Sequence, residues 1–230
     1  AHVRSRPPAR RMTAIDTDVL ILGAGAAGLV TALSARGRRV CLLYSGDAAS
    51  ELAQGGIAAA VGADDSPELH ATDTRVAGRG RNDDGAVRFA CHGAPSAVHW
   101  LESLGVRFAR TDGLWSLHLE AAHSRARVLH AGGDATGAEI MRALREQVAE
   151  ASHVEALPRM RAVALLRGPG GTGGVIARGV DGKPITVRAR DIVVATGGIG
   201  ALYQRTTNPT SARGDGLAMA LAAGVRCADL

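Results

Sequence analysis

The feature that most constrains the fold is a glycine pattern directly after an apolar run. Residues 19–22 are Val-Leu-Ile-Leu, the turn reads Gly23-x-Gly25-x-x-Gly28, and an Ala-rich amphipathic segment follows. Strand, glycine turn and helix in this order are typical of a dinucleotide-binding unit. Gly23 permits a tight turn, Gly25 lets the backbone approach a pyrophosphate, and Gly28 allows close helix–strand packing. The alternative is an ordinary strand–helix turn. A second apolar strand at residues 40–43 favours the dinucleotide-binding unit over this alternative.

Composition limits the class of protein. The chain has 230 residues, of which 46% are hydrophobic and 21% charged, as in a globular protein with a sizeable core. Its net charge is +5, but Arg4, Arg6, Arg10 and Arg11 supply most of it, so the sequence indicates no nucleic-acid-binding face. We expect residues 1–15 to form a basic disordered leader rather than a secretory signal. No apolar run reaches the ~18 residues of a membrane helix, so no membrane partner is expected.

The three cysteines predict neither a disulfide framework nor a metal site. Cys41, Cys91 and Cys227 lie far apart and in no Cys-x-x-Cys spacing. They are typical of small buried apolar side chains in a reducing compartment, which favours a cytoplasmic protein.

The rest of the chain predicts a doubly wound α/β domain over residues 16–230. Helix start and stop signals indicate residues 67–77, a helix capped by Asp83 or Asp84, a separate helix from Pro95 to a stop at Gly105, and one opened by a capping box at Thr136 and Glu139. Glycine-rich turns separate three strands of a β-meander, at residues 159–166, 174–180 and 185–190. A fully buried strand is expected at residues 191–198, ending in a glycine turn.

Several motifs together resemble one group of flavoproteins. The first glycine pattern and the later Val193-Val194-Ala195-Thr196-Gly197-Gly198 resemble the two-part signature of FAD-binding proteins of the glutathione reductase type. Within these, the chain resembles the succinate dehydrogenase, fumarate reductase and L-aspartate oxidase flavoproteins, and the L-aspartate oxidases most closely. The matching motifs are Ala53-Gln54-Gly55-Gly56-Ile57-Ala58, His123-Ser124-Arg125, Leu129-His130-Ala131, Asp134-Ala135-Thr136-Gly137, Thr206-Thr207-Asn208-Pro209 and Gly214-Asp215-Gly216.

The resemblance implies a non-covalent FAD and a set of cofactor contacts. Covalent members carry a His five residues before the Gln or Glu of the Ala-x-Gly-Gly segment, whereas this chain has Ala49 there. The expected contacts are Gly23, Gly25, Ala26, Ala27, Gly28, Ser45, Ser50, Gln54, Gly55, Gly56 and Asp215. For Asp215 the alternative is a plain helix N-cap. The acid that usually binds the ribose is absent, because the second strand ends in Tyr44-Ser45.

Glu120 resembles the acidic residue with which aspartate oxidases meet the substrate ammonium group. A carboxylate would repel a plain dicarboxylate such as succinate but attract a zwitterionic amino acid. The alternative for Glu120 is a solvated surface acid. His123, Ser124, Arg127 and His130 form a dense polar cluster that suits carboxylate and proton chemistry, or equally a hydrogen-bonded structure. His123 is the second candidate catalytic residue, and no metal is expected.

The resemblance implies oxidation of L-aspartate to iminoaspartate, with oxygen or fumarate as electron acceptor and a quinolinate synthase downstream in NAD biosynthesis. It also implies that this chain is the N-terminal portion of the FAD-binding domain, incomplete at its C-terminus and without the capping domain, and inactive by itself. The alternatives are a soluble fumarate reductase or succinate oxidase, and a truncated non-catalytic FAD-binding module.

Overall fold

The computed structural model describes residues 13–168 and 171–227, which fall into two compact units. Unit 1 contains the described residues before Ala48 together with those from Ala151 onward, and unit 2 is Ala48–Glu150. Most of the expected leader lies outside the described residues. The prediction of disorder is wrong for residues 13–15, because they begin the first strand. Whether both units work as one FAD-binding domain stays a prediction.

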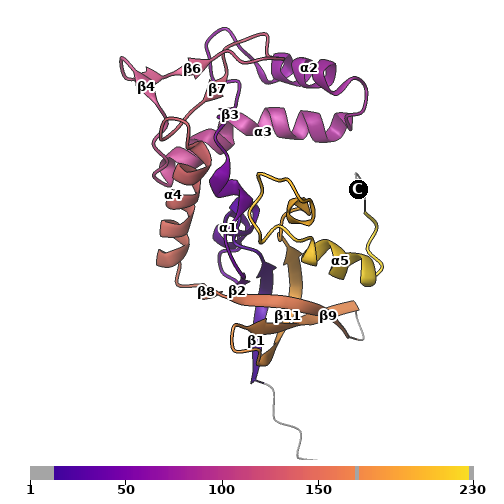
Figure 1. Cartoon of the computed structure of the whole chain (residues 1–230). Coiled ribbons are helices and arrows are strands. Elements are labelled where there is room, and N and C mark those ends of the chain that lie inside the picture. Colours follow the sequence, from indigo (N-terminus) through magenta and orange to yellow (C-terminus); the bar gives the residue numbers. More distant parts are fainter. Residues whose placement is uncertain (1–12, 169–170, 228–230) are drawn as a thin grey trace, which may run out of the picture. The chain divides into compact units, whose positions relative to one another are not determined.

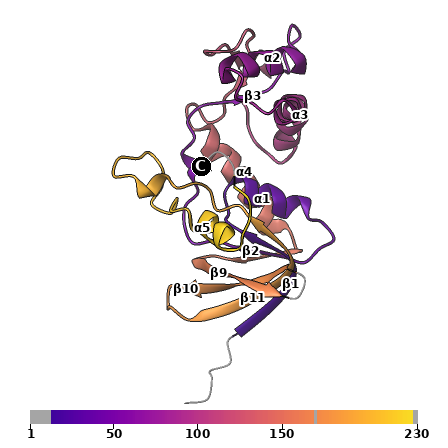
Figure 2. The same ribbon diagram turned by 90° about the vertical axis from the view of Figure 1, so that its right-hand side faces the viewer.

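Unit 1 is built on a six-stranded sheet with the order β8-β2-β1-β11-β10-β9 (Figure 1). Its strands are β1 (Thr13–Leu22), β2 (Val40–Leu43), β8 (Val154–Leu157), β9 (Met160–Gly168), β10 (Gly171–Gly179) and β11 (Pro184–Val194). β1 pairs in parallel with β2 and β11, and β2 with β8, whereas β10 is antiparallel to both of its neighbours (Figure 2). The predicted doubly wound sheet with a β-meander is confirmed.

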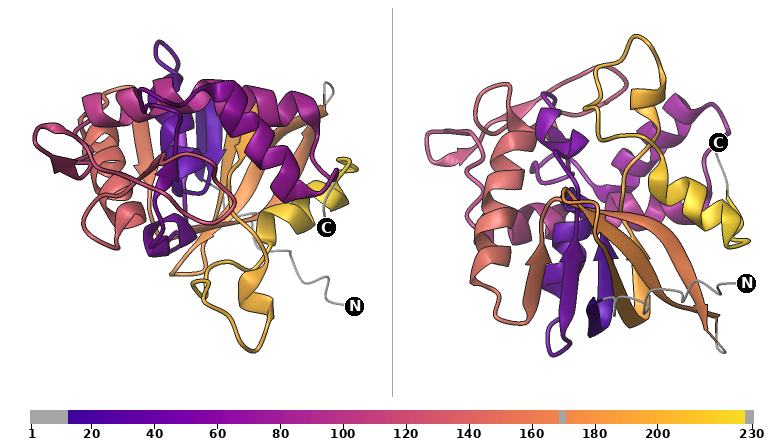
Figure 3. Two further views of the ribbon diagram at one scale, coloured as in Figure 1. Left: turned by 90° about the horizontal axis from the view of Figure 1, so that it is seen from above. Right: turned by 60° about the horizontal axis from the view of Figure 1, so that its bottom comes forward.

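Apolar side chains at the centre of this sheet form the core of unit 1. Leu20, Leu22, Val175 and Val187 are at most 1% exposed, and all four residues of β2 are buried. Such continuous burial is expected of parallel strands that are covered on both faces. The other elements of unit 1 are α1 (Ala26–Ser34), η2 (Gly200–Leu202) and α5 (Asp215–Ala222), with α5 beside the β9 edge of the sheet (Figure 3).

Unit 2 is mainly helical. Its elements are η1 (Ala49–Leu52), β3 (Ile57–Ala58), α2 (Pro67–Gly78), α3 (Asp84–Ser103), β4 (Arg110–Thr111), β5 (Leu114–Trp115), β6 (Leu117–His118), β7 (Val128–Leu129) and α4 (Thr136–Glu150). α2 and α3 pack side by side, and β3, β7 and β6 form a small sheet (Figure 1). The predicted helix at residues 67–77 and the Asp83 cap are confirmed, since Asp83 accepts a hydrogen bond from the Ala86 N–H.

One predicted helix start and one predicted capping box in unit 2 are wrong, although the helix predicted to open at Thr136 is confirmed as α4. Pro95 lies inside the continuous helix α3, whose buried residues Val87, Cys91 and Val98 run along one face past the proline. Burial of this face offsets the backbone hydrogen bond that a proline removes. The capping box at Thr136 is also wrong, because its hydroxyl accepts from the Ala131 N–H and the Glu139 carboxylate binds Arg142.

The strand predictions also need correction at the end of the sheet. The strands expected at residues 185–190 and 191–198 are one strand, β11, which pairs with β1 along its length. Its last residues are not fully buried, and Val194 is 42% exposed. Cys41 and Cys91 are buried as expected, whereas Cys227 is only half-buried.

We expect Gly28→Ala to destabilise unit 1. A Cβ on Gly28 would lie 1.9 Å from the carbonyl oxygen of Gly23, so the turn or the helix must shift. Overpacking of this kind costs about 1–3 kcal/mol, more than the helix propensity that alanine adds. Urea unfolding followed by circular dichroism measures the loss. Gly198→Ala is the matched control, because its Cβ would meet no atom within 4 Å; equal stability of the two variants would contradict the prediction.

Candidate functional site

The carboxyl ends of three parallel strands meet at one edge of the sheet in unit 1. The Gly23 N–H donates to the Leu43 carbonyl at 2.8 Å, and the Ala195 N–H donates to the Leu22 carbonyl at 2.8 Å. The connection from β1 leads to β2 on one side, and β11 lies on the other side of β1. Open α/β sheets bind ligands at such a switch point.

Helix α1 begins at this edge without a side-chain cap. Its N-cap residue Gly25 has extended backbone angles and makes no side-chain hydrogen bond, and the first turn, which starts with Ala26 and Ala27, contains no acidic residue. The helix end therefore presents its dipole and backbone N–H groups to an anion with no carboxylate of its own beside them. The first turn of α1 thus fits a pyrophosphate, as the sequence predicts for Gly25, Ala26 and Ala27.

Gly23 and Gly28 are required by packing inside the turn. Gly23 has φ +108°, and a Cβ on it would lie 2.3 Å from the Ala195 carbonyl oxygen. Gly28 faces the Gly23 carbonyl in the same way. The two glycines therefore hold α1 and the end of β11 close to β1, and this is the role that the sequence assigns to them.

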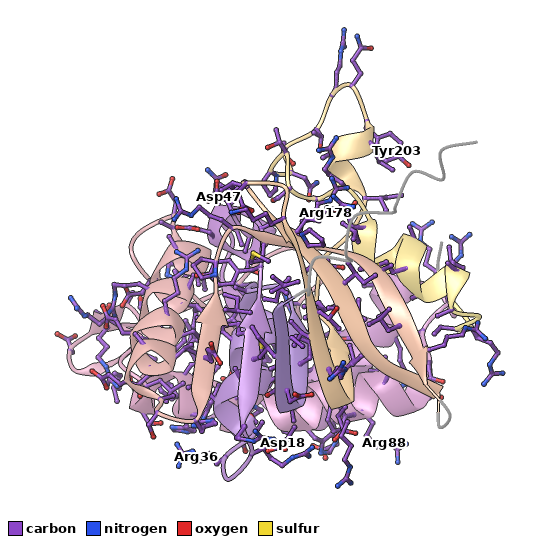
Figure 4. The ribbon with its side chains drawn as sticks, turned by 90° about the horizontal axis from the view of Figure 1, so that it is seen from below. Asp18, Arg36, Asp47, Arg88, Arg178 and Tyr203 are labelled. Carbon is purple, nitrogen blue, oxygen red and sulfur yellow. The ribbon has the colours of Figure 1, made fainter. Side chains whose placement is uncertain are left out.

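Two further segments of unit 1 lie at this edge. Ser45 follows β2 and is exposed, and the Ser211 hydroxyl donates to the Asp47 carbonyl just beyond it. Figure 4 shows Asp47 at the opposite end of the sheet from Asp18 and Arg36. The same view places Tyr203 on the segment that follows β11. Gly197 and Gly198 have open space where a side chain would lie.

Asp215 is not a helix cap. It is the first residue of α5, the N-cap is Gly214, and both Asp215 carboxylate oxygens accept hydrogen bonds from Arg161 on β9 at 2.7 Å. This pairing raises the pKa of the Arg161 guanidinium. Arg161 and Asp215 line an open groove of about 490 Å³ between β9 and α5, whose other lining residues are mostly apolar. A Cβ on Gly216 would lie 2.0 Å from the Thr196 hydroxyl, so α5 starts directly against the end of the β11 segment.

The cofactor residues predicted in unit 2 fall into two kinds. Gln54 and Gly55 are exposed, and a Cβ on Gly55 would meet no atom within 4 Å. Gly56, in contrast, is needed for packing, because its Cβ would lie 2.5 Å from the Leu129 carbonyl oxygen on β7. Ser50 is half-buried in η1, and its carbonyl lies against Gly137 at the start of α4. Of these four, Gln54 and Gly55 are the residues most open to a ligand.

Glu120 and His123 lie in one turn between β6 and β7. The His123 N–H donates to the Glu120 carbonyl at 3.2 Å. The Glu120 side chain is 49% exposed, and its Oε1 lies 3.2 Å from Nε2 of His130. Nδ1 of His123 lies 3.2 Å from Nη1 of Arg127. Because a guanidinium only donates, Nδ1 of His123 is the acceptor, and the neutral ring carries its proton on Nε2.

Arg127 is completely buried and holds this turn in place. Its Nε and Nη2 donate to the two carboxylate oxygens of Asp65 at 2.8 Å, and its Nη1 donates to Asp73 at 2.7 Å. Asp73 also accepts from the N–H and the hydroxyl of Ser124 at 2.8 Å. The guanidinium is thus used by carboxylates of the chain itself. Of the two readings of the polar cluster, Arg127 and Ser124 follow the structural one.

The same contacts change the acidity of both aspartates. Burial by itself would raise the pKa of Asp73, but the hydrogen bonds from Ser124 and Arg127 lower it to about 2. Burial also acts to raise the pKa of Asp65, and the hydrogen bond from Arg127 again lowers it below its ordinary value. Both carboxyls are therefore charged at neutral pH.

Sequence reasoning missed Asp65, Asp73 and Arg161. Arg127 pairs with carboxylates 62 and 54 residues away, and Arg161 pairs with one 54 residues away. The position of Arg127 next to a buried strand was the signal for an ion pair, because a buried arginine requires acidic partners. Which acids these are follows only from the fold.

We predict that Arg127→Met destabilises unit 2 by about 3–5 kcal/mol, because it leaves two aspartates without their cation. Both tryptophans of the chain, Trp100 and Trp115, lie in unit 2, so tryptophan fluorescence during urea unfolding reports on this unit. Arg125→Met is the control. Arg125 lies two residues away and is 42% exposed, and its ion pair with Asp64 should contribute less than about 1 kcal/mol. A loss no larger than that of the control would contradict the prediction that the ion pairs of Arg127 stabilise unit 2.

Acid should weaken unit 2 through Asp73. Because the folded pKa of about 2 is below the ordinary 3.8, this carboxyl contributes stability above pH 3.8, and the contribution is lost as the pH falls toward 2. The free energy of unfolding, followed by tryptophan fluorescence, should therefore fall over this interval. In Asp73→Asn the fall should be smaller. An Asp64→Asn control should keep the slope of the unchanged chain, and an equal slope in all three would speak against the assignment.

The described residues contain neither a metal cluster nor a membrane-spanning helix. Residues 13–168 and 171–227 contain no group of three His, Cys, Asp or Glu side chains that could hold a metal ion. In the same part of the chain, no helix has both the length and the apolar character that crossing a bilayer requires.

Curated relatives of this chain are L-aspartate oxidases. The chain is 45% identical to the L-aspartate oxidase of Mesorhizobium japonicum over 216 residues, which cover 92% of this chain and 42% of the relative. It is 42% identical to the enzyme of Streptomyces coelicolor, with 94% of this chain and 39% of the relative covered. The chain therefore spans about two fifths of the length of these relatives.

Solved structures of similar proteins have the same fold. E. coli quinol fumarate reductase superimposes with a TM-score of 0.87 at 28% identity, covering 92% of this chain and 37% of that one. Mycobacterium smegmatis Sdh1 gives 0.87 at 30% identity, with 92% and 39% covered. The model of a family described as FAD binding domain matches residues 18–230. The glycine turn at the sheet edge, which has no side-chain cap, is consistent with this match. The chain therefore belongs to the FAD-binding domain family, whose cofactor is FAD.

Proposed function

We propose that this chain is the FAD-binding part of an L-aspartate oxidase, which oxidises L-aspartate to iminoaspartate. The observation that carries the proposal is Glu120, a half-exposed carboxylate on a turn that buried ion pairs hold in place. Such a group attracts the ammonium of an amino acid and repels a dicarboxylate that lacks one. The similarity to named L-aspartate oxidases supports the same substrate.

FAD, when bound, supplies the redox chemistry by accepting a hydride from the substrate. Residues of this chain would hold it without a covalent bond, since Ala49 offers no nucleophile at the position of the covalent members. The backbone at Gly25, Ala26 and Ala27 would bind the pyrophosphate, and Ser45, Gln54 and Gly55 present exposed groups for further contacts. Ser50, Gly56 and Asp215 would contribute from more enclosed positions.

The electron acceptor, the next enzyme and the cellular location follow from the same proposal. Oxygen or fumarate would reoxidise the flavin, a quinolinate synthase would use the product, and the protein would work in the cytoplasm. His123 would offer its Nε2–H as a hydrogen-bond donor beside Glu120, since its Nδ1 is taken by Arg127.

The test uses the complete gene product that contains these 230 residues, purified with its flavin. We expect acid precipitation to release FAD, and L-aspartate but not succinate to bleach the flavin absorbance without oxygen. Glu120→Gln should raise the KM for L-aspartate about tenfold, because a charge-assisted contact to the ammonium is lost. Glu68→Gln, which alters an exposed carboxylate near His92 in the same unit, is the control and should leave KM unchanged.

Two results would contradict the proposal. Bleaching by succinate and not by L-aspartate would make the protein a fumarate reductase or succinate oxidase. Retained flavin absorbance with no response to either acid would make it a flavin-binding module without this activity.

A further inference from the structure

Glu120 has a neighbour that determines where its carboxylate can lie. Nε2 of His130 is 3.2 Å from Oε1 of Glu120, and the two side chains are 22% and 49% exposed. The contact joins the turn that follows β6 to the residue that follows β7. When Nε2 of His130 carries its hydrogen, it attracts Oε1 and leaves Oε2 of Glu120 for another partner.

The backbone of His130 is held on both sides. Its carbonyl accepts a hydrogen bond from the Ala109 N–H at 2.8 Å, and the next N–H, that of Ala131, donates to the buried Thr136 hydroxyl at 3.1 Å. The ring of His118 packs edge-on against the His130 ring, with 4.9 Å between the ring centroids. His130 therefore offers Glu120 a partner in a defined position.

The backbone of Glu120 is fixed from the other direction. The His123 N–H donates to its carbonyl, Ala122 takes a left-handed conformation with φ 68°, and Ser124 binds Asp73, which Arg127 also binds. These contacts determine where the Glu120 backbone lies but do not involve its side chain. Among the contacts of the described residues, the one with His130 reaches the carboxylate itself.

We propose that His130 is a positioning residue that holds the Glu120 carboxylate ready for the substrate ammonium. The inference rests on the proposed function, because it assumes that Glu120 meets this ammonium. His130 acts through Glu120, so its contribution is specific to ligands that carry the ammonium group. A dicarboxylate without that group makes no attractive contact with Glu120, so the loss of His130 should not weaken its binding.

The experiment compares variants of the complete gene product in its FAD-loaded form. His130→Phe keeps a ring against His118 but removes the Nε2 donor, and His130→Gln restores a donor nitrogen at similar reach. His92→Phe is the matched control, because His92 also neighbours a glutamate in unit 2, with Nε2 3.5 Å from Glu68. The readouts are the KM for L-aspartate and the inhibition constant of succinate, with FAD content and Tm measured alongside.

We expect His130→Phe to raise the KM for L-aspartate about two- to fivefold, the size of a partly exposed ion pair, and to leave the succinate constant unchanged. His130→Gln should return KM to within about twofold of the unchanged protein, and His92→Phe should have no effect. If His130→Phe fails to fold, His130→Asn replaces it, because its amide is too short to reach Oε1.

Other outcomes overturn the inference. Equal changes in the KM for L-aspartate and the succinate constant would mean that His130 supports the site only structurally. A lower KM in His130→Phe would mean that His130 competes with the substrate for Glu120. In both cases the unchanged protein still oxidises L-aspartate, and the proposed function stands. If the unchanged protein does not respond to L-aspartate, the proposed function fails and this inference fails with it.

Discussion

The architecture of unit 1 depends on the close approach of three backbones around Gly23. The turn after β1 hydrogen-bonds to β2 through the Gly23 N–H, and β11 hydrogen-bonds back to the end of β1 through Ala195. The position of a Gly23 Cβ is occupied by the Ala195 carbonyl, and that of a Gly28 Cβ by the Gly23 carbonyl. A side chain at either glycine would push apart the helix end and the strand ends around the predicted anion site.

In unit 2, polar residues lie on short strands and turns, and ion pairs hold them in place. The buried Arg127 is neutralised by Asp65 and Asp73, and Asp73 also binds Ser124, so one ion-pair cluster joins α2 to the turn that carries Glu120. A buried pair of this kind adds little net stability over apolar packing, but breaking it is costly. The cluster therefore holds the turn in one conformation, as the proposed contact of Glu120 with a substrate charge requires.

The sequence predicts best those features whose cause is local. Gly28 is required by the Gly23 carbonyl five residues before it, and the Asp83 cap depends on a hydrogen bond from Ala86, three residues away. It fails where distant packing decides. Local rules predict that a helix begins at Pro95. However, α3 continues past this residue, because the helix buries an apolar face on both sides of it. The partners of Arg127 lie more than fifty residues away, and no periodicity connects them.

Asp215 shows how a residue can serve the fold and stay available to a cofactor. As a sequence motif, an aspartate between two glycines at a helix start is equally consistent with a cap and with a ligand contact. The structure removes the cap, since both carboxylate oxygens face Arg161. Two oxygens offer about four lone-pair positions, and Arg161 occupies two. With 29% of its side chain exposed, Asp215 can still accept a hydrogen bond from a cofactor hydroxyl group while Arg161 fixes its orientation. The ion pair thus makes the predicted FAD contact more defined rather than excluding it.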